Sequence, residues 1–276
     1  MQRIALFNIE CYSSSEAIIQ FIEEHYEKLA IVVTTDMYRG KRGNVFKQVI
    51  VNYRRSGLGF VIYLTYNFIL YFWLIYLSRL VSFITRRERK KFTISEICHK
   101  YQIRHIKTPN VNSEDVIAEL KKANLDLIVI YFFDQIIKEQ IISIPKKGVI
   151  NVHAALLPKC KGLFPVFYSA FNNDRKFGIT VHEIVDTSID SGAIFVQDEL
   201  VVDHKRSILS LDKQVNNKGV SLISKVINNF NLYYQNRTPQ GSGGSYFSFP
   251  NISDIKNAQS QSFRLVSLQE FMKDFF

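Results

Sequence analysis

Short apolar runs alternate with helical patterns over most of this 276-residue chain. Several runs are continuous rather than alternating, as expected of strands that are covered on both faces. The segments between them carry apolar residues at helical spacing, and two begin after Ser-containing starts typical of helix N-termini. The predicted strands are Arg3–Asn8, Ala30–Thr34, Ile103–Lys107, Leu125–Phe132, Gly148–Val152, Gly178–Val185 and Ala193–Val201. The predicted helices are Ser14–Tyr26, Ser113–Ala123, Asp134–Ile142 and a long one over 206–234.

This alternation predicts an α/β fold with a doubly wound, mostly parallel sheet. Ligands of such sheets bind beyond the carboxyl ends of the strands. The first loop, NIECYSSSEA at 8–17, contains no glycine, so the dinucleotide-binding fingerprint is missing, and no P-loop is present. The pattern therefore gives little support to nicotinamide or nucleoside-triphosphate chemistry.

One segment departs from the pattern. Ser56–Ser78 contains no charged residue and is long enough to cross a bilayer, which takes about 20 apolar residues. Basic clusters flank it, with twelve Lys or Arg and one acid between Arg39 and Lys91. The net charge of that segment is +11 and that of the whole chain is +10, so the rest of the chain is close to neutral. The basic character belongs to an insert and does not indicate nucleic-acid binding by the whole domain.

The insert raises the question of a membrane. The predicted strands before and after it belong to one sheet, and basic residues flank it on both sides, so a simple span is disfavoured. We expect an interfacial helix or a re-entrant hairpin that places residues 56–78 at a membrane surface, with the basic clusters near anionic lipid. A buried helical hairpin and an oligomer contact, such as a homodimer, remain open alternatives. An RNA-binding patch comes third.

Cysteine usage indicates a reducing compartment. The three cysteines, Cys11, Cys98 and Cys160, show no CxxC spacing, which argues against a disulfide framework and a zinc ribbon. The first residues read as a core strand and lack the features of a signal peptide. We expect a cytoplasmic protein without a bound metal.

The candidate chemistry lies at the end of the fifth predicted strand, in INVHAALLPKCKG at 150–162. Asn151 and His153 are two residues apart, so both side chains point to the same face of the strand. Asp190 follows in an Asp-Ser-Gly turn between two strands. Such a group can perform acid–base chemistry, because a carboxylate orients and charges an imidazole while an amide donates to developing negative charge. His182, in the middle of a strand, is expected to be structural.

These motifs resemble the folate-dependent formyltransferases. INVHAALLPKCKG followed by FGITVHEIVDTSIDSGAIFVQ is similar to that family's Asn-x-His-x-x-Leu-Leu-Pro signature and its later Asp turn, most clearly over Leu125–Val201. The resemblance implies a Rossmann-like formyltransferase fold and transfer of a formyl group from 10-formyltetrahydrofolate, the cosubstrate, to a primary amine. It implies that Asn151 stabilises the oxyanion, that His153 assists the proton to N10, and that Asp190 accepts the amine's proton.

The resemblance also implies a donor site along the fourth strand and the loop after it. The pterin is expected near Val129–Ile137. The expected cofactor contacts are Phe132, Phe133, Asp134, Gln135, Leu157, Pro158 and Asp186.

Departures from the family pattern bear on the acceptor. His153 is followed by Ala154 and Ala155, where the family usually has a serine, and the later loop reads KGLFP rather than the RGAAP of tRNA enzymes. About seventy residues follow Lys205, which leaves little room for a tRNA-holding domain. We expect an amino sugar on a nucleotide or lipid carrier, and a protein peripheral to the inner face of the cell membrane. The alternatives are a methionyl-tRNA formyltransferase-like enzyme, a formyltetrahydrofolate hydrolase and a non-catalytic membrane-associated binding protein.

The predicted organisation is a single catalytic domain interrupted by the insert. Residues 1–36 form its first part, 37–91 the apolar and basic helical insert, and 92–235 the remainder. Residues 236–276 form a linker, flexible at Gln240–Ser245, and a tail that ends in a short amphipathic helix.

Overall fold

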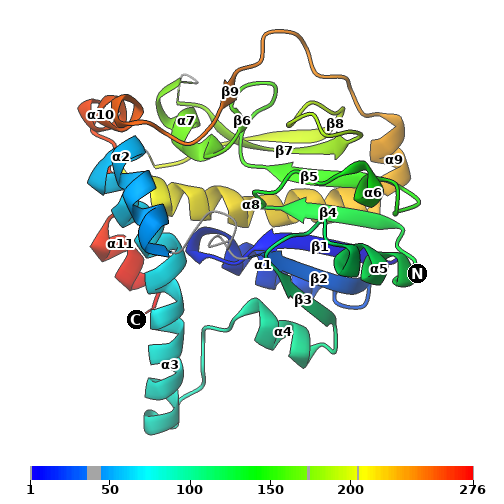
Figure 1. Ribbon diagram of the computed structural model, residues 1–276, viewed down its shortest axis with the longest axis horizontal. Coiled ribbons are helices and arrows are strands. Elements are labelled where there is room, and N and C mark those ends of the chain that lie inside the picture. Colours follow the sequence, from blue (N-terminus) through cyan, green and yellow to red (C-terminus); the bar gives the residue numbers. More distant parts are fainter. Residues whose placement is uncertain (1, 36–44, 173–174, 204, 276) are drawn as a thin grey trace.

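A seven-stranded sheet organises the protein (Figure 1). The computed structural model describes residues 2–35, 45–172, 175–203 and 205–275. The strand order is β3-β2-β1-β4-β5-β7-β8. The first five strands in this order pair in parallel, whereas β7 pairs antiparallel with both β5 and β8. This confirms the predicted doubly wound, mostly parallel sheet. The strands are β1 Ile4–Ile9, β2 Leu29–Thr35, β3 Arg104–Thr108, β4 Leu127–Tyr131, β5 Val149–His153, β7 Phe177–Ile184 and β8 Ile194–Leu200. A separate pair joins β6, Lys161–Gly162, to β9, Tyr246–Phe247.

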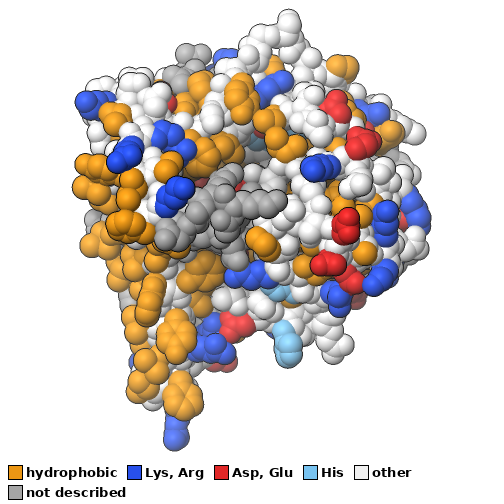
Figure 2. Space-filling model, in the orientation of Figure 1, with side chains coloured by type: hydrophobic (Ala, Val, Ile, Leu, Met, Phe, Trp, Pro, Cys, Tyr) orange, Lys and Arg blue, Asp and Glu red, His pale blue; other side chains and the backbone are white. Residues whose placement is uncertain are grey.

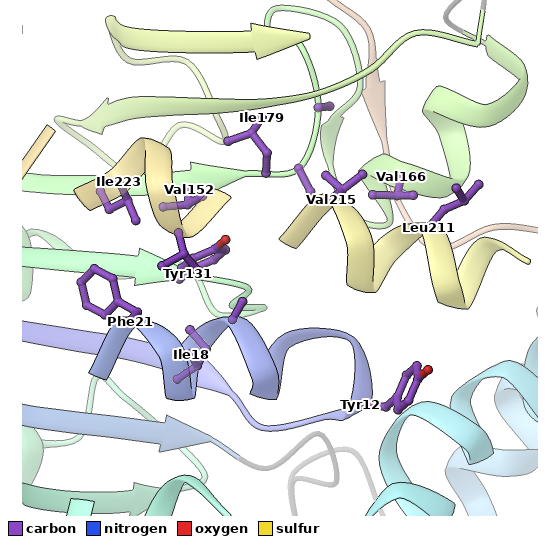
Figure 3. Packing of buried hydrophobic residues seen from close by; sticks show 14 of the residues in the cluster. Tyr12, Ile18, Phe21, Tyr131, Val152, Val166, Ile179, Leu211, Val215 and Ile223 are labelled. Atoms are coloured by element: carbon purple, nitrogen blue, oxygen red, sulfur yellow. The ribbon is translucent and has the colours of Figure 1, made fainter. Parts of the chain in front are cut away.

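Helices cover both faces of the sheet. One buried cluster contains α1 and α8 with side chains from the sheet, including Phe21, Tyr131 and Ile223 (Figure 3). The other face is covered by α5 and α6. The remaining helices lie around these two layers. The helices are α1 Tyr12–His25, α2 Val45–Leu64, η2 Thr65–Leu70, α3 Tyr71–Thr85, α4 Ile94–Lys100, α5 Glu114–Lys122, α6 Glu139–Ile142, α7 Pro165–Asn172, α8 Ile208–Asn228, α9 Phe230–Gln235, α10 Ile252–Ser260 and α11 Leu268–Lys273.

A glycine sets the distance between α8 and the sheet. A Cβ on Gly219 would lie 2.2 Å from the Tyr131 hydroxyl oxygen, so no larger residue fits without displacement. The Tyr131 hydroxyl donates to the main-chain carbonyl of Asn216 on the same helix. The long helix expected over 206–234 is divided at Asn229, whose φ of −127° and ψ of 39° are not helical, into α8 and α9.

The helix expected over Asp134–Ile142 is largely a loop. Only Glu139–Ile142 is helical. Residues before it are held by a neighbouring loop, because Asn112 donates to the carbonyl of Ile136 at 3.0 Å and accepts from the Lys138 N–H at 2.8 Å. These long-range hydrogen bonds replace the local ones that a helix would need. Residues 134–137 instead line a cavity.

The insert is a bent helical rod rather than a hairpin. Helix α2 is kinked at Gly57, whose φ of 81° is left-handed, and continues through the π-helical turn η2 into α3. No reversal of direction occurs between Leu58 and Thr85, so both predicted hairpins are wrong. The strands on either side, β2 and β3, are neighbours in the sheet, as expected. The expected boundary between residues 36 and 37 lies outside the described residues.

The inner side of the rod is buried and its outer side is exposed. Phe60, Tyr63 and Leu64 are at most 4 % exposed, whereas Trp73, Phe83 and Ile84 are at least 68 % exposed. Figure 2 shows apolar side chains gathered along this edge of the molecule. By length and composition, Val45–Thr85 is the one helix among the described residues that could cross a bilayer.

The C-terminal segment folds back over the sheet instead of leaving it. Gln240 donates to the carbonyls of Asp190 and Gly192, both at 2.8 Å, and the Ser245 carbonyl accepts from the Lys161 N–H at 2.8 Å. The segment expected to be a flexible link is therefore anchored at both ends. The expected amphipathic helix near the C-terminus is α11, and its Phe271 is buried.

Candidate active site

The three predicted catalytic residues converge at the carboxyl ends of the central strands. Asn151 and His153 lie at the end of β5, and Asp190 lies in the turn that precedes β8. Asn151 Nδ2 donates to Asp190 Oδ1 at 3.2 Å, and His153 Nδ1 lies 3.6 Å from Asp190 Oδ2. Residues separated by up to 39 positions thus form one polar cluster.

Asp190 is the centre of this cluster. Its Oδ2 also accepts the main-chain N–H of Gly162 at 2.8 Å, and Oδ1 lies 3.3 Å from His182 Nε2. Burial alone would raise the pKa of the Asp190 carboxyl, but the two imidazoles and the Gly162 N–H outweigh it and hold the pKa well below its usual range. Asp190 is therefore ionised at neutral pH.

The imidazole of His153 lies between a main-chain carbonyl and the Asp190 carboxylate. Burial lowers the pKa of His153, and the neighbouring Asp190 carboxylate opposes that shift without reversing it. His153 Nε2 lies 2.8 Å from the Cys160 carbonyl, which can only accept, so Nε2 carries the hydrogen. Nδ1 lies 3.6 Å from Asp190 Oδ2, so a hydrogen on Nδ1 would point at the carboxylate. The expected charge on this imidazole stays a prediction.

His182 belongs to the cluster, although the sequence suggested a purely structural role. It pairs directly with Asn151 across the β5–β7 ladder and is 1 % exposed. Its Nδ1 donates to the Glu183 carbonyl at 2.9 Å, and Asn151 Nδ2 lies 3.1 Å from its Nε2. His182 therefore orients the Asn151 amide.

The backbone around the cluster is strained. Asp190, Phe132, Cys160 and Phe164 have φ between 48° and 54°, in the left-handed region that residues other than glycine seldom adopt. Such outliers gather at functional sites because surrounding contacts hold them in place. At Asp190 those contacts include the two hydrogen bonds from Gln240 to the turn.

A cavity of about 340 Å³ opens beside the cluster. The part that we call the sheet wall is formed by the end of β4, the following loop, the end of β5 and the Asp190 turn. Its residues include Ile130, Phe132, Phe133, Asp134, Gln135, Asn151, His153, Ile184, Asp186 and Asp190. Five of the seven expected cofactor contacts are in this set.

Leu157 and Pro158, the other two expected cofactor contacts, are not among the residues that line this cavity. The Leu157 N–H donates to the Thr180 hydroxyl at 3.1 Å, and its carbonyl accepts from Gln197 at 2.7 Å. These bonds hold the Leu-Leu-Pro turn against β7 and β8. The turn directs the chain away from the site and does not contribute side chains to the cavity.

A second part of the cavity, which we call the insert wall, comes from regions that the sequence did not point to. Its residues are Tyr63, Asn67 and Phe68 of the insert and Ile208, Asp212 and Asn216 of α8. The Tyr63 hydroxyl donates to Asp212 Oδ2 at 3.1 Å. Phe164 of the loop after Gly162 packs against Phe60 and Tyr63, with ring centroids 5.1 and 6.1 Å apart. The insert thus supports the loop that holds Asp190.

The described residues contain no group of His, Cys, Asp or Glu able to hold a metal ion. Cys160 is buried, and burial raises the pKa of its thiol. A thiol in that environment is a poor nucleophile.

Comparisons with known proteins place the chain in a family. Residues 82–227 match the family model described as formyl transferase, which is more than half of the chain. The methionyl-tRNA formyltransferase of Finegoldia magna is 32 % identical over 158 residues, 56 % of this chain and 51 % of that protein. The enzyme of the same name from Fusobacterium nucleatum is 31 % identical over 138 residues, 50 % of this chain and 43 % of that protein. The chain spans about half the length of these curated relatives.

Solved structures share the fold. A sugar N-formyltransferase from Shewanella sp. superposes with a TM-score of 0.53 and 17 % identity, covering 99 % of this chain and 86 % of that one. Phosphoribosylglycinamide formyltransferase from Streptococcus pneumoniae gives a TM-score of 0.53 and 14 % identity, covering 84 % of this chain and 99 % of that one. At these identities the likeness concerns the fold alone. Together with the family match, the sheet and the Asn-His-Asp cluster identify the chain as a member of the formyl transferase family.

Proposed function

We propose that the chain transfers a formyl group from 10-formyltetrahydrofolate to a primary amine. The observation that carries the proposal is the convergence of Asn151, His153 and Asp190 on one cavity at the carboxyl ends of the strands. Family membership supports it, as do two structural neighbours whose descriptions name 5-N-formyl-tetrahydrofolate and folinic acid.

The sheet wall fits a folate donor. Ile130, Phe132 and Phe133 give it apolar surface for a flat pterin ring, and the loop over 134–137 adds main-chain groups for ring nitrogens. Asp186, four residues before Asp190, also lines the cavity. The donor supplies a formyl carbon bound to N10, and the chain supplies the groups around it.

Each residue of the cluster has a task in the transfer. Asn151 Nδ2 contacts His182 and Asp190 in this structure and exchanges its hydrogen bond to Asp190 for one to the formyl oxygen as that oxygen becomes an oxyanion. A donor of this kind is worth about 10²–10³ in rate. The ionised Asp190 accepts the proton that the attacking amine loses, directly or through water. His153, which faces Asp190 through Nδ1, assists the movement of this proton to the leaving N10. Positioned proton transfer contributes about 10²–10⁴ more.

For the acceptor we propose an amino sugar on a nucleotide or lipid carrier. The supporting observation is the insert wall, which sets carboxylate, amide and phenol groups beside aromatic rings. Two structural neighbours are described as a sugar N-formyltransferase and a sugar 3N-formyl transferase. A third, from Francisella tularensis with 19 % identity and a TM-score of 0.53, is described as a 4-N formyltransferase.

A panel of amines tests both parts of the proposal. The purified protein is incubated with 10-formyltetrahydrofolate and amino sugars, their nucleotide conjugates, glycinamide ribonucleotide or charged initiator tRNA, and products are read by mass. We expect formylation of an amino sugar. Formylation of tRNA alone would contradict the acceptor assignment. Release of formate without an acceptor would indicate a hydrolase, and no turnover at all would indicate a binding protein.

We further propose that the enzyme works in the cytoplasm, at the inner face of the membrane. The outer side of the insert rod is its apolar face, formed by Leu58, Ile62, Trp73, Tyr76, Leu77, Leu80, Val81, Phe83 and Ile84. Exposed arginines stand at both ends, Arg54 at one and Arg86 and Arg87 at the other. Each basic side chain near an anionic surface contributes about 1 kcal/mol.

Charge favours lipid over a second copy of the chain. Pairing two copies along the apolar face in parallel would place Arg54 near Arg54, and antiparallel pairing would place it near Arg86 and Arg87. Both arrangements bring like charges together, whereas anionic headgroups neutralise both ends of the rod.

Vesicle sedimentation tests the membrane proposal. We expect binding to vesicles containing phosphatidylglycerol, weaker binding to pure phosphatidylcholine, and loss of binding in Leu80→Asp. Leu232→Asp is the matched control, because Leu232 is 59 % exposed on α9, outside the apolar face. A wild-type protein that does not bind vesicles and dimerises through this face would contradict the proposal.

A further inference from the structure

The N-terminus of α1 is filled by the chain's own polar groups. In open α/β sheets, the helix after the first strand presents free N–H groups and a positive dipole end at the ligand edge, where anions bind. Here the Ser13 N–H already donates to Asn67 Oδ1 of the insert at 2.9 Å. Ser13, Ser14 and Ser15 are at most 1 % exposed.

A carboxylate reinforces this closure. Asp212 of α8 interacts with the Ser13 side chain and accepts hydrogen bonds from the Tyr63 hydroxyl at 3.1 Å and Asn216 Nδ2 at 3.3 Å. Asp212 is 6 % exposed. The chain's own carboxylate therefore occupies the position where a ligand anion would meet the helix dipole.

These residues face the same cavity as the proposed catalytic cluster. Tyr63, Asn67, Asp212 and Asn216 line it together with Asn151 and Asp190. An acceptor that fills this cavity therefore meets the insert wall when its amine is near the cluster. Phe68 and Phe164 add aromatic surface to the same space.

We infer that the insert wall is the acceptor subsite, and that it selects a neutral, hydroxyl-bearing ring and rejects phosphate. Sugar hydroxyls donate to the Asp212 carboxylate, and the apolar face of the ring packs on Phe68 and Phe164. A phosphate placed there would be repelled by Asp212 and would find the Ser13 N–H already engaged. The phosphates of a nucleotide or lipid carrier must then lie outside this part of the cavity. The inference rests on the proposed function and adds what sets acceptor choice.

Steady-state kinetics on Asp212→Asn test the inference. We expect KM for the amino-sugar acceptor to rise at least tenfold, while KM for 10-formyltetrahydrofolate changes less than threefold. Inorganic phosphate should inhibit the variant competitively against the acceptor at least tenfold more strongly than the wild type. Tyr63→Phe should raise acceptor KM by a smaller factor, since it removes one partner of Asp212.

Asp274→Asn is the matched control. Asp274 is also hydrogen-bonded by a tyrosine, Tyr12, but does not line the cavity. We expect wild-type acceptor KM and phosphate sensitivity in this variant. If a folded Asp212→Asn protein also keeps both wild-type values, Asp212 only caps α1 and the inference is overturned.

A binding measurement separates this inference from the proposed function. Titration calorimetry with glucosamine measures binding to the subsite without turnover. We expect at least tenfold weaker binding to Asp212→Asn than to the wild type. If the wild type binds glucosamine in this way but formylates no amine, only the proposed activity fails. If the wild type formylates an amine and Asp212→Asn does not weaken glucosamine binding, only the inference fails.

Discussion

The two walls of the cavity are built in different ways. The sheet wall takes its proposed catalytic groups from one strand end and one turn within 40 residues of sequence, where the sheet itself fixes their geometry. The insert wall joins Tyr63 to Asp212 across 149 residues, and half of it stands on a helix that lies outside the alternating pattern. The comparison teaches that the groups proposed for the chemistry and for acceptor choice belong to separately built parts of the molecule, which mutation should distinguish.

Asp190→Asn should have the largest effect, on the sheet wall. The variant keeps the size of the side chain but loses the proton acceptor, so we expect kcat to fall at least about 10³-fold with acceptor KM nearly unchanged. Formyl transfer is measured by mass. Asp198→Asn, an exposed aspartate on β8, should retain wild-type kcat. A large rise in acceptor KM in Asp190→Asn would contradict the assignment of the chemistry to the sheet wall and of acceptor binding to the insert wall.

Asp212→Asn should change how stability depends on pH. Burial raises the pKa of the Asp212 carboxyl to about 6, and its hydrogen bonds only partly oppose this. Between the unfolded value of 3.8 and this pKa the folded state binds more protons, so this group's contribution to stability falls as pH rises. Relative to wild type, the variant should gain about 3 kcal/mol between roughly pH 4 and pH 7. Urea unfolding at the two pH values measures the difference, and a constant difference would refute it.

His182→Ala should weaken catalysis without removing any group proposed to react. The Asn151 amide loses the polar contact that orients it, and we expect kcat to fall about 10–100-fold, as misplacement by an ångström does. His182→Gln offers a polar group at a similar place and should recover part of the loss. Equal loss of activity in both variants, with lowered thermal stability, would show that His182 is only structural.

Gly219→Ala tests how closely α8, which carries part of the insert wall, must approach the sheet. The added Cβ would meet the Tyr131 hydroxyl at 2.2 Å, so the variant should be destabilised by about 1–3 kcal/mol. Thermal unfolding measures the change. Gly241→Ala is the control, because nothing lies within 4 Å of its added Cβ. Unchanged stability in Gly219→Ala would mean that the helix can move outward freely.

Much of the sheet wall could be predicted because its determinants are local. Continuous apolar runs place the strands to within about two residues, and Asn151, His153 and Asp190 stand in short motifs at strand ends. His182 was missed although it faces Asn151, because the β5–β7 register that pairs them is not visible in the sequence.

The insert wall could not be predicted for a physical reason. An apolar helix with basic ends fits a membrane, a core or a partner equally well, and only the packing shows which side is buried. The prediction of a helix directly after β4 failed for a related reason. The hydrogen bonds from Asn112 that override the helical pattern there come from another loop. Local patterns cannot report contacts whose partners are distant in sequence.

The contact of Phe164 with Phe60 and Tyr63 has a thermodynamic consequence. One helical rod touches the loop beside Asp190 on its inner side and carries the apolar face on its outer side. If vesicles change the affinity for the acceptor, linkage requires the acceptor to change the affinity for vesicles by the same factor. The gain in affinity for the amine and the gain in affinity for the membrane would then be the same coupling free energy, and either binding experiment could measure it.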